Sequence, residues 1–283
     1  MKLVEDVFEI AKSFMKNTKN VKLNHEGIEA TASEMLKSGI KSFPKKDVLD
    51  EAILCLSELI GNSINYCYWY GKSTIRPNDC SSVKMYELVT ESLNYFDWDN
   101  FEECIEVLEQ LLAINRFPLL EERSRHLREL VKLKAPDFAN KIANGDHRSC
   151  EPYFYELVSD YTGYASDIFL KRASLFFLQL YRNLGWFEAS MFSLHVPADY
   201  QVPKLLNYHN CIEYSVVLDA MLESNYLIPK HSQDECEIRA ATILACKALA
   251  VKTGWNIADI DGWLWLRRKE VTSPFHLCIT TDY

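Results

Sequence analysis

The clearest helical pattern in the chain is Asp99-Asn100-Phe101-Glu102-Glu103-Cys104-Ile105-Glu106-Val107-Leu108-Glu109-Gln110-Leu111-Leu112. Its apolar residues recur in steps of three and four, which places Phe101, Ile105 and Leu108 on one face of a helix. Asp99 precedes this series, so the sequence predicts that Asp99 caps the helix N-terminus. Such a helix buries one stripe of its surface against a core.

The same apolar spacing recurs along most of the chain, so the sequence predicts an all-α fold. The nine prolines fall largely between the expected helices, where a missing backbone N–H costs least. The tail from Val271 to Tyr283 alternates enough to predict extended structure. Further helices are expected at 3–16, 25–38, 46–60, 82–95, 119–132, 167–183, 212–223 and 234–252.

Length and composition predict a single globular domain over residues 1–283. The chain has 283 residues, of which 48% are hydrophobic, so it can bury a large core. No internal repeat or low-complexity linker interrupts the helical pattern. The best candidate for a boundary between two lobes is a polar stretch near 144–150, Asn144-Gly145-Asp146-His147-Arg148-Ser149.

Charge and cysteine content bear on partners and compartment. The net charge is −9 and no basic stripe is present, so we expect no nucleic-acid polymer as a partner. One phosphate could still be held in a local basic pocket. Nine cysteines without a C-x-x-C pair indicate free thiols in a reducing compartment. The first residues lack the apolar core of a signal peptide, and no run has membrane-spanning length, so we expect a cytoplasmic protein without membrane contact.

Several motifs that would indicate a cofactor are absent from the sequence. It contains no G-x-G-x-x-G, no Walker loop, no H-E-x-x-H and no G-x-S-x-G. His195 and Asp199 stand four residues apart, but Pro197 between them prevents the helical geometry of a metal-binding pair. We therefore expect no metal and no other cofactor.

An acidic residue lies between two prolines in the most unusual stretch, Val196-Pro197-Ala198-Asp199-Tyr200-Gln201-Val202-Pro203-Lys204. Each proline pushes its predecessor away from helical geometry, which predicts a stiff turn around Asp199. A carboxylate fixed in an aromatic setting can be aimed in one direction, and burial would tune its pKa. The alternative interpretation is that Asp199 simply caps the following helix.

A lysine opens the strongly apolar helix expected at 167–183. With about 3.6 residues per turn, Lys171 shares a face with Ser174 and Leu178. A lysine on a dry face needs a partner anion or a route to solvent. A ligand phosphate would meet that need, whereas the alternative is a side chain that reaches the surface.

The Ala-rich helix expected at 234–252 carries Glu237 and Arg239 near its start. These residues are two positions apart and lie on opposite faces, so we expect only one of them to face inward. Ala241 and Ala245 mark a close-packed face on the side of Glu237. Glu237 is therefore the better candidate for a buried polar contact.

Four aromatic residues crowd into Asn65-Tyr66-Cys67-Tyr68-Trp69-Tyr70-Gly71, directly after an expected helix. Core packing explains part of this crowding. Buried Tyr and Trp side chains also need hydrogen-bond partners, so a wall that stacks on a base is the alternative.

Taken together, these stretches resemble the queuosine salvage protein family. Ala198-Asp199-Tyr200-Gln201-Val202-Pro203-Lys204 is similar to the family motif Ala-Asp-Tyr-Arg-Val-Pro-Gln. Lys171-Arg172-Ala173-Ser174 is similar to Lys-Arg-Ala-Gln, and Glu237-Ile238-Arg239-Ala240 to Glu-Ile-Arg-Gly. Further similar segments follow in the family's order at 64–69, 117–123, 261–265 and 274–283.

The chain departs from the family pattern at three of these positions. Gln201 replaces the family's Arg, Lys204 its Gln, and Ser174 its Gln. The segment after Gly71 also looks short. These differences put in question which base or which phosphate the chain accepts.

The resemblance implies an all-α fold related to helix-hairpin-helix DNA glycosylases, a monomeric enzyme, and hydrolysis of queuosine 5′-monophosphate to queuine and ribose 5-phosphate. Cleavage of an N-glycosidic bond builds positive charge on C1′ and the ring oxygen while the departing base gains negative charge. We expect Asp199 to be the catalytic group near C1′. There it would steady the sugar cation and orient or deprotonate the attacking water.

We expect the remaining contacts to bind the nucleotide. Lys171 would bind the 5′-phosphate, with Lys204 or His195 as further ligands. A deazapurine lacks N7, so Glu237 or Asp261 would contact its pyrimidine edge, while aromatic rings stack on the base. The expected substrate-binding residues are Lys171, Tyr200, Glu237, Asp261, Trp265, Tyr66, Trp69, Lys204 and His195.

Two other functions stay open from the sequence alone. The chain could be an N-glycosylase for another modified nucleotide or nucleoside, or for a base in DNA, which would require a positive face. It could also be a non-catalytic helical binding module. The binding module gives no reason for the Asp199 turn, Lys171 and the aromatic cluster to occur together, and a wide separation of these features in the fold would favour it.

Overall fold

The computed structural model describes residues 2–40, 50–71 and 80–283. This part of the chain is mainly α-helical, as expected, and its only sheet is a short two-stranded one. The helices are α1 (Lys2–Lys16), α2 (His25–Ser38), α3 (Glu51–Ser63), α4 (Ser82–Ser92), α5 (Phe101–Ile114), α6 (Leu120–Lys132), α7 (Ala135–Ala143), α8 (Glu151–Asp160), α9 (Thr162–Ala165), α10 (Lys171–Leu184), α11 (Gln201–Tyr208), α12 (Val216–Glu223), α13 (Gln233–Thr253) and α14 (Ile257–Arg267). Two 3-10 helices, η2 (Leu93–Tyr95) and η3 (Glu188–Phe192), complete the helical elements.

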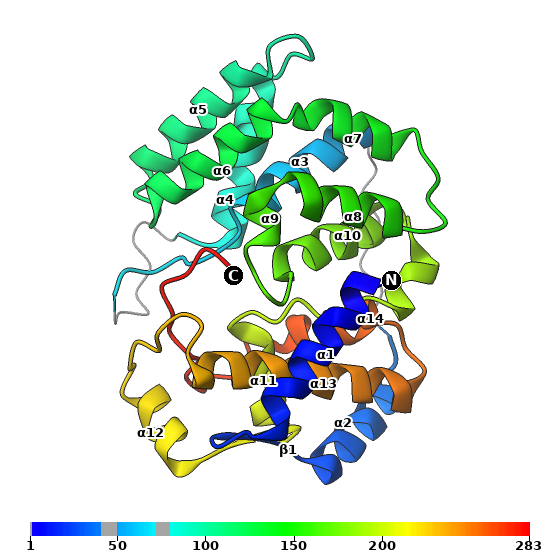
Figure 1. Cartoon of the computed structure of the whole chain (residues 1–283), viewed down its shortest axis with the longest axis vertical. Helices are drawn as coiled ribbons and strands as arrows, with labels where there is room; N and C mark the ends of the chain where they lie inside the picture. The colour runs from blue at the N-terminus through cyan, green and yellow to red at the C-terminus, as the bar shows by residue number, and fades with distance from the viewer. Residues whose placement is uncertain (1, 41–49, 72–79) are drawn as a thin grey trace.

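The helices form two groups along the long axis of the molecule (Figure 1). The upper group holds α3 to α10, and the lower group holds α1, α2 and α11 to α14. The C-terminal tail leaves the lower group and ends near the middle of the view, where the backbone N–H of Cys67 donates to the carbonyl of Tyr283 at 3.0 Å. A continuous cluster of buried apolar side chains runs through both groups.

Apolar periodicity located most of the longer helices, although the helix expected at 167–183 begins only at Lys171. The patterns at 3–16, 25–38 and 119–132 match α1, α2 and α6 to within a residue or two. Within the range expected at 46–60, α3 begins at Glu51 after its cap Asp50, and residues 46–49 lie outside the described residues. The expectation that Asp99 caps α5 is wrong by one residue, because Asn100 holds that position.

Two short helices that the sequence does not predict, α7 and α8, each have a proline as their second residue. Pro136 and Pro152 lie in the first turns of α7 and α8. A proline is tolerated there because the first backbone N–H groups of a helix have no partner inside the helix. The sequence predicts these prolines as separators between helices, whereas each lies in the first turn of a helix. The helix α14 was missed for a different reason, since its apolar residues follow no single stripe.

The sheet corrects one further expectation. Strand β1 (Val21–Leu23) pairs antiparallel with β2 (Ile212–Tyr214), so the helix expected at 212–223 begins only at Val216. The tail from Val271 to Tyr283 has no helix, as expected, and its only ladder contact is an isolated bridge between Leu227 and Leu277. All nine cysteines are buried thiols. No described helix is long and apolar enough to cross a membrane.

A glycine fixes how α2 packs against the turn between α11 and β2. A Cβ atom on Gly27 would lie 1.8 Å from the carbonyl oxygen of Asn210. The obstacle is backbone, so a side chain could not be accommodated by a rotamer change. The absence of a side chain at position 27 therefore lets α2 approach the strand that follows the Asp199 region.

We predict that Gly27→Ala destabilises the protein by about 1–3 kcal/mol or more, because the backbone around Asn210 must move. The measurement is urea unfolding followed by circular dichroism. Ser33→Ala, on the exposed face of the same helix, is the matched control and should leave the free energy of unfolding nearly unchanged. Equal stability of the two variants would contradict the packing argument.

Candidate active site

Asp199 uses one carboxylate oxygen to start a helix. Its Oδ1 accepts hydrogen bonds from the backbone N–H of Gln201 at 2.7 Å and of Val202 at 3.1 Å, in the first turn of α11. Its Oδ2 accepts no hydrogen bond from any described residue, and Asp199 is half-buried. The capping interpretation is therefore correct for Oδ1, and it leaves Oδ2 available to a ligand.

The turn around Asp199 is stiff for a reason that the sequence analysis gave only in part. Pro197 precedes the turn, as expected, but Pro203 lies inside the first turn of α11. Val202 is helical, so the expectation that Pro203 pushes its predecessor out of helical geometry is wrong. The two hydrogen bonds to Asp199 Oδ1 hold the end of the turn instead.

Lys171 is buried at the start of α10, with 3% of its surface exposed. Its Nζ donates to the carbonyl oxygen of Asn65 at 3.2 Å, across from the end of α3. The interpretation that Lys171 reaches the surface is therefore wrong. Burial lowers the pKa of Lys171 to about 8, since a desolvated ammonium loses stability relative to the neutral amine.

Lys171 and Asp199 influence each other electrostatically. Burial raises the pKa of the Asp199 carboxyl, and the Lys171 ammonium is the strongest influence that lowers it again. In return, Asp199 is the strongest influence that raises the pKa of Lys171. The two groups make no direct ion pair within the described structure. Each charge therefore influences the pKa of the other without a direct contact between the two side chains.

Asp261 adds a second negative charge to this region. Its Oδ2 accepts from Arg182 Nη2 at 2.6 Å, and both side chains are largely buried. The Asp261 charge raises the pKa of Asp199 further. Asp261 is therefore near Asp199, as expected, although one of its oxygens is already bonded to arginine.

Aromatic rings flank the Asp199 turn. Trp69 contacts Tyr200 edge-on with ring centroids 4.8 Å apart, and Phe275 from the tail lies 4.9 Å from Tyr200 and 5.6 Å from Trp69. Only 1% of Trp69 is exposed, so its ring is packed against protein. The indole Nε1 of Trp69 is buried and has no hydrogen-bond partner among the described residues. A buried donor of this kind favours a ligand acceptor.

The expectation that only one of Glu237 and Arg239 faces inward is wrong, because both are fully buried. The first half of α13 is buried on nearly all sides, and the apolar residues Cys236, Ile238 and Ala240, which alternate with these charges, could have indicated this. Arg239 Nε donates to the carbonyl oxygen of Ala198 at 3.0 Å. Arg239 therefore contacts the Asp199 turn directly, and sequence analysis did not identify this role.

Glu237 lies on the other side of α13. Its carboxylate accepts hydrogen bonds from Thr18, Gln233 and the backbone N–H groups of Lys19 and Asn20. These contacts fix the loop between α1 and β1. The prediction that Glu237 makes a buried polar contact is correct, and the contact is with this loop.

His195 and Lys204, expected as further phosphate ligands, bond to protein. His195 Nε2 lies 2.9 Å from Ser174 Oγ and its Nδ1 lies 3.0 Å from the Val196 carbonyl oxygen. Burial lowers the pKa of His195 to about 4, so the ring is neutral at pH 7. Lys204 Nζ donates to the carbonyl oxygens of Arg268 and Val271 after α14.

The other two expected aromatic residues also make protein contacts. Tyr66 is fully buried, and its hydroxyl lies 3.2 Å from His126 Nδ1 while the Arg123 guanidinium lies 4.5 Å from its ring. Trp265 is half-buried and carries the guanidinium of Arg268 over its ring at 3.2 Å. Tyr66 is therefore packed inside the protein, and Trp265 lies near the end of α14.

Two departures from the family pattern have a visible structural context. Ser174 bonds to His195, as described above. The side chain of Gln201 follows Asp199 directly, and its Oε1 is buried without a hydrogen-bond partner among the described residues. Like Trp69 Nε1, this oxygen is an unsatisfied polar atom beside the Asp199 turn.

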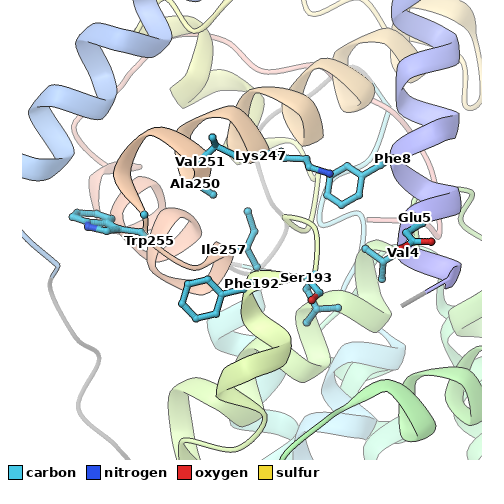
Figure 2. Close-up of a pocket in the computed structure, with 12 residues that line it drawn as sticks. Val4, Glu5, Phe8, Phe192, Ser193, Lys247, Ala250, Val251, Trp255 and Ile257 are labelled. Atoms are coloured by element: carbon cyan, nitrogen blue, oxygen red, sulfur yellow. The ribbon is translucent and has the colours of Figure 1, made fainter.

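A cavity of about 480 Å³ lies elsewhere, between α1, η3 and the junction of α13 with α14 (Figure 2). Its walls are mainly apolar, and the ammonium of Lys247 lies 3.7 Å from the centre of the Phe8 ring. None of the expected site residues lines it. We place the candidate site at Asp199 and Lys171, because unsatisfied polar atoms and perturbed charges gather there. Within the described residues, no group of three or more side chains is arranged to hold a metal ion.

Fold and site together define a mainly helical protein with a buried lysine and a carboxylate at the junction of two helix groups. The sequence model of the queuosine salvage protein family matches residues 58–279, which is most of the chain. The chain therefore belongs to this family, and the resemblance inferred from its motifs is confirmed.

Curated relatives carry one common name, queuosine 5′-phosphate N-glycosylase/hydrolase. The relative from Sphaerobacter thermophilus is 31% identical over 192 residues, which cover 59% of this chain and 58% of that protein. The relative from Dictyostelium discoideum is 26% identical over 269 residues, covering 88% and 69%. The relative from Mus musculus is 24% identical over 276 residues, covering 83% and 81%. The chain thus spans little more than half of the Sphaerobacter protein and most of the other two.

We predict that the Asp199 carboxyl titrates above the ordinary range of an aspartic acid, because burial disfavours its charged form. Removing the facing ammonium in Lys171→Met should raise this pKa further, since the ammonium favours the carboxylate. The measurement is a pH titration of the carboxyl carbon by NMR. Lys252→Met removes an ammonium that pairs with the exposed Glu29 and is the control. An unchanged Asp199 titration in Lys171→Met would contradict the described electrostatic coupling.

Proposed function

We propose that this chain hydrolyses the N-glycosidic bond of queuosine 5′-monophosphate, releasing queuine and leaving ribose 5-phosphate. Family membership and the shared name of the relatives support this activity. The observation that carries the proposal is the Asp199 carboxylate, with Oδ1 fixed by two backbone N–H groups, Oδ2 without a partner among the described residues, and a pKa coupled to the buried ammonium of Lys171. The Asp199 turn, Lys171 and the aromatic stretch lie in one region of the fold. A non-catalytic binding module gives no reason for that arrangement.

Asp199 acts on the sugar in this mechanism. As the bond between C1′ and the base nitrogen breaks, positive charge spreads over C1′ and the ring oxygen. The Asp199 carboxylate stabilises that charge and orients a water molecule for attack on C1′. Water adds its hydroxyl to C1′, and the remaining proton balances the negative charge of the departing base. Fixing Oδ1 limits the carboxylate to one orientation, which reduces the cost of organising the site during reaction.

Lys171 supplies the cation in this mechanism. Its ammonium uses one donor on Asn65, and its other N–H groups can bind the 5′-phosphate. With a pKa of about 8, the ammonium is mainly charged at pH 7. The same charge lowers the pKa of Asp199 and so opposes the effect of its burial. An acidic protein can thus hold an anionic substrate through one local cation.

The base contacts in our proposal come from the atoms that the fold leaves unsatisfied. Trp69 Nε1 can donate to a carbonyl oxygen of the base, and Gln201 Oε1 can accept from an N–H group. Asp261 contacts the pyrimidine edge of the base in our proposal. Tyr200, beside Trp69, completes the aromatic side of the site. Five of the expected binding residues make structural contacts with protein in our proposal: Glu237, His195, Lys204, Tyr66 and Trp265.

Several broader features belong to the same proposal. We propose that the fold is related to helix-hairpin-helix DNA glycosylases, and that the chain acts as a cytoplasmic monomer on a free nucleotide. The net charge of −9 supports a nucleotide over a nucleic-acid polymer. The connection at residues 144–150, between α7 and α8, stays a prediction as a lobe boundary.

We predict that the wild-type chain releases queuine from queuosine 5′-monophosphate and not from ordinary nucleotides, as measured by chromatography of the free base. Asp199→Asn should lower kcat by about 10²-fold or more while substrate binding persists, because the amide keeps the capping oxygen and loses the negative charge.

A second aspartate provides the control for this variant. Asp50 caps α3 with the same pattern, since its Oδ1 accepts from Ala52 N–H at 2.9 Å and Ile53 N–H at 3.0 Å. Asp50→Asn should therefore repeat any effect of a weakened cap without affecting turnover. Near-normal release of base by Asp199→Asn would remove Asp199 from the catalytic role.

We predict that Lys171→Ala weakens binding of the 5′-monophosphate more than binding of the nucleoside queuosine, because the phosphate loses its cationic partner. The measurement compares KM and Kd for the two ligands. Lys84→Ala, which removes a lysine paired with Glu87 on α4, is the control. Equal losses for nucleotide and nucleoside would show that Lys171 does not bind the phosphate.

A further inference from the structure

We propose that Asp167 and Arg239 are a positioning pair that sets the Asp199 carboxylate relative to the Lys171 ammonium. The inference rests on the proposed function, since it assigns the pair a role in the same site. Neither residue is expected to touch the nucleotide. Each acts through the backbone of a residue that we expect to touch it.

Arg239 holds the Asp199 side of the site. Its guanidinium is fully buried in α13, and its Nε donates to the carbonyl oxygen of Ala198 at 3.0 Å. Ala198 directly precedes Asp199, so this hydrogen bond fixes the peptide from which the Asp199 side chain departs. The guanidinium also lies 4.8 Å from the Phe169 ring and 4.5 Å from the Tyr283 ring, and the two aromatic contacts restrict its plane.

Asp167 holds the Lys171 side of the site. Its Oδ2 accepts from the backbone N–H of Lys171 at 2.8 Å, and its Oδ1 accepts from the backbone N–H of Phe169 at 3.0 Å. These bonds close the turn that begins α10, in which Leu170 has a positive φ of 47°. A left-handed leucine persists only where its surroundings enforce it. Asp167 therefore fixes the backbone from which the Lys171 side chain departs.

A bidentate ion pair joins the Asp199 side of the site to the Lys171 side. Arg239 Nη1 donates to Asp167 Oδ1 at 2.9 Å and Nη2 donates to Oδ2 at 2.6 Å. Glu235, one turn earlier in α13, accepts from Nη1 at 3.3 Å. A planar guanidinium sets both the distance and the angle of such a pair, whereas an ammonium sets only a distance. The backbones that carry Asp199 and Lys171 are thus linked through one rigid group.

Arg239→Lys keeps the positive charge and removes the planar guanidinium that donates to both oxygens of Asp167. We expect it to lower kcat about 10- to 100-fold with a smaller change in KM, because the reacting groups are displaced and the ligand contacts stay. The pH limits of kcat/KM should also move, since the separation of Asp199 and Lys171 changes. Asp167→Asn should act in the same direction, and the double variant should lose less than the product of the two single losses.

Leu108→Ala, in the buried face of α5, controls for stability. It should lower the unfolding temperature while leaving kcat and both pH limits at wild-type values. A folded Arg239→Lys variant with wild-type kcat and pH limits would overturn the proposal, and so would fully multiplicative losses. If Arg239→Lys does not fold, the same criteria apply to Asp167→Asn alone.

A measurement without substrate separates this inference from the proposed function. NMR titration of the Asp199 carboxyl carbon should give a shifted pKa in Arg239→Lys compared with wild type, whichever nucleotide the chain hydrolyses. A shifted titration in a chain that releases no queuine would support the positioning pair and reject the proposed substrate. An unshifted titration would reject the positioning pair even if queuine is released.

Discussion

The buried ion pair between Asp167 and Arg239 is the constraint on which the candidate site depends. Removing two charges from water is costly, and the attraction between them offsets that cost only when the geometry is good and the remaining donors are bonded. Here the guanidinium meets that condition through Asp167, Glu235 and the Ala198 carbonyl. Loss of either partner would leave an uncompensated charge in the core, at a cost of roughly 3–5 kcal/mol. The pair therefore stabilises one arrangement of the Asp199 turn and the start of α10.

In our proposal, a structural role and a chemical role belong to one side chain, that of Asp199. Two backbone N–H groups favour its ionised form, as does Lys171, while burial and Asp261 oppose it. Because Oδ1 serves the helix, Oδ2 is aimed by the backbone and needs no further side chain to orient it. The two interpretations made from the sequence, a cap and a reactive carboxylate, are therefore compatible. Each describes a different oxygen atom.

The sequence predicted what depends on local order. Apolar periodicity located most of the long helices, and the proline-flanked stretch and the apolar helix start made Asp199 and Lys171 candidates, which are buried or half-buried in the structure. The helices α7 and α8 were not predicted because proline occurs both as a helix breaker and, as Pro136 and Pro152 do, in the first turn of a helix. Arg239 was underestimated because opposite faces of a helix can both be buried.

What could not be predicted depends on contacts between distant residues. Lys171 bonds to Asn65 over 106 positions, and Arg239 bonds to Asp167 over 72 positions. The aromatic residues show the same limit, since composition could not distinguish a ring that faces a ligand from one packed inside, as Tyr66 is. The short sheet between 21–23 and 212–214 was missed for this reason as well.

The spacing of these contacts also orders the events of folding. Lys171 and Asp199 are both synthesised before Arg239, and contacts between residues far apart in sequence form late because a long loop must first close. During synthesis, the nascent chain therefore contains Lys171 and Asp199 before it contains Arg239, which we propose positions them. The site is complete only when α13 packs against it. A nascent chain of about 200 residues would therefore contain Lys171 and Asp199 without the Arg239 that positions them in our proposal.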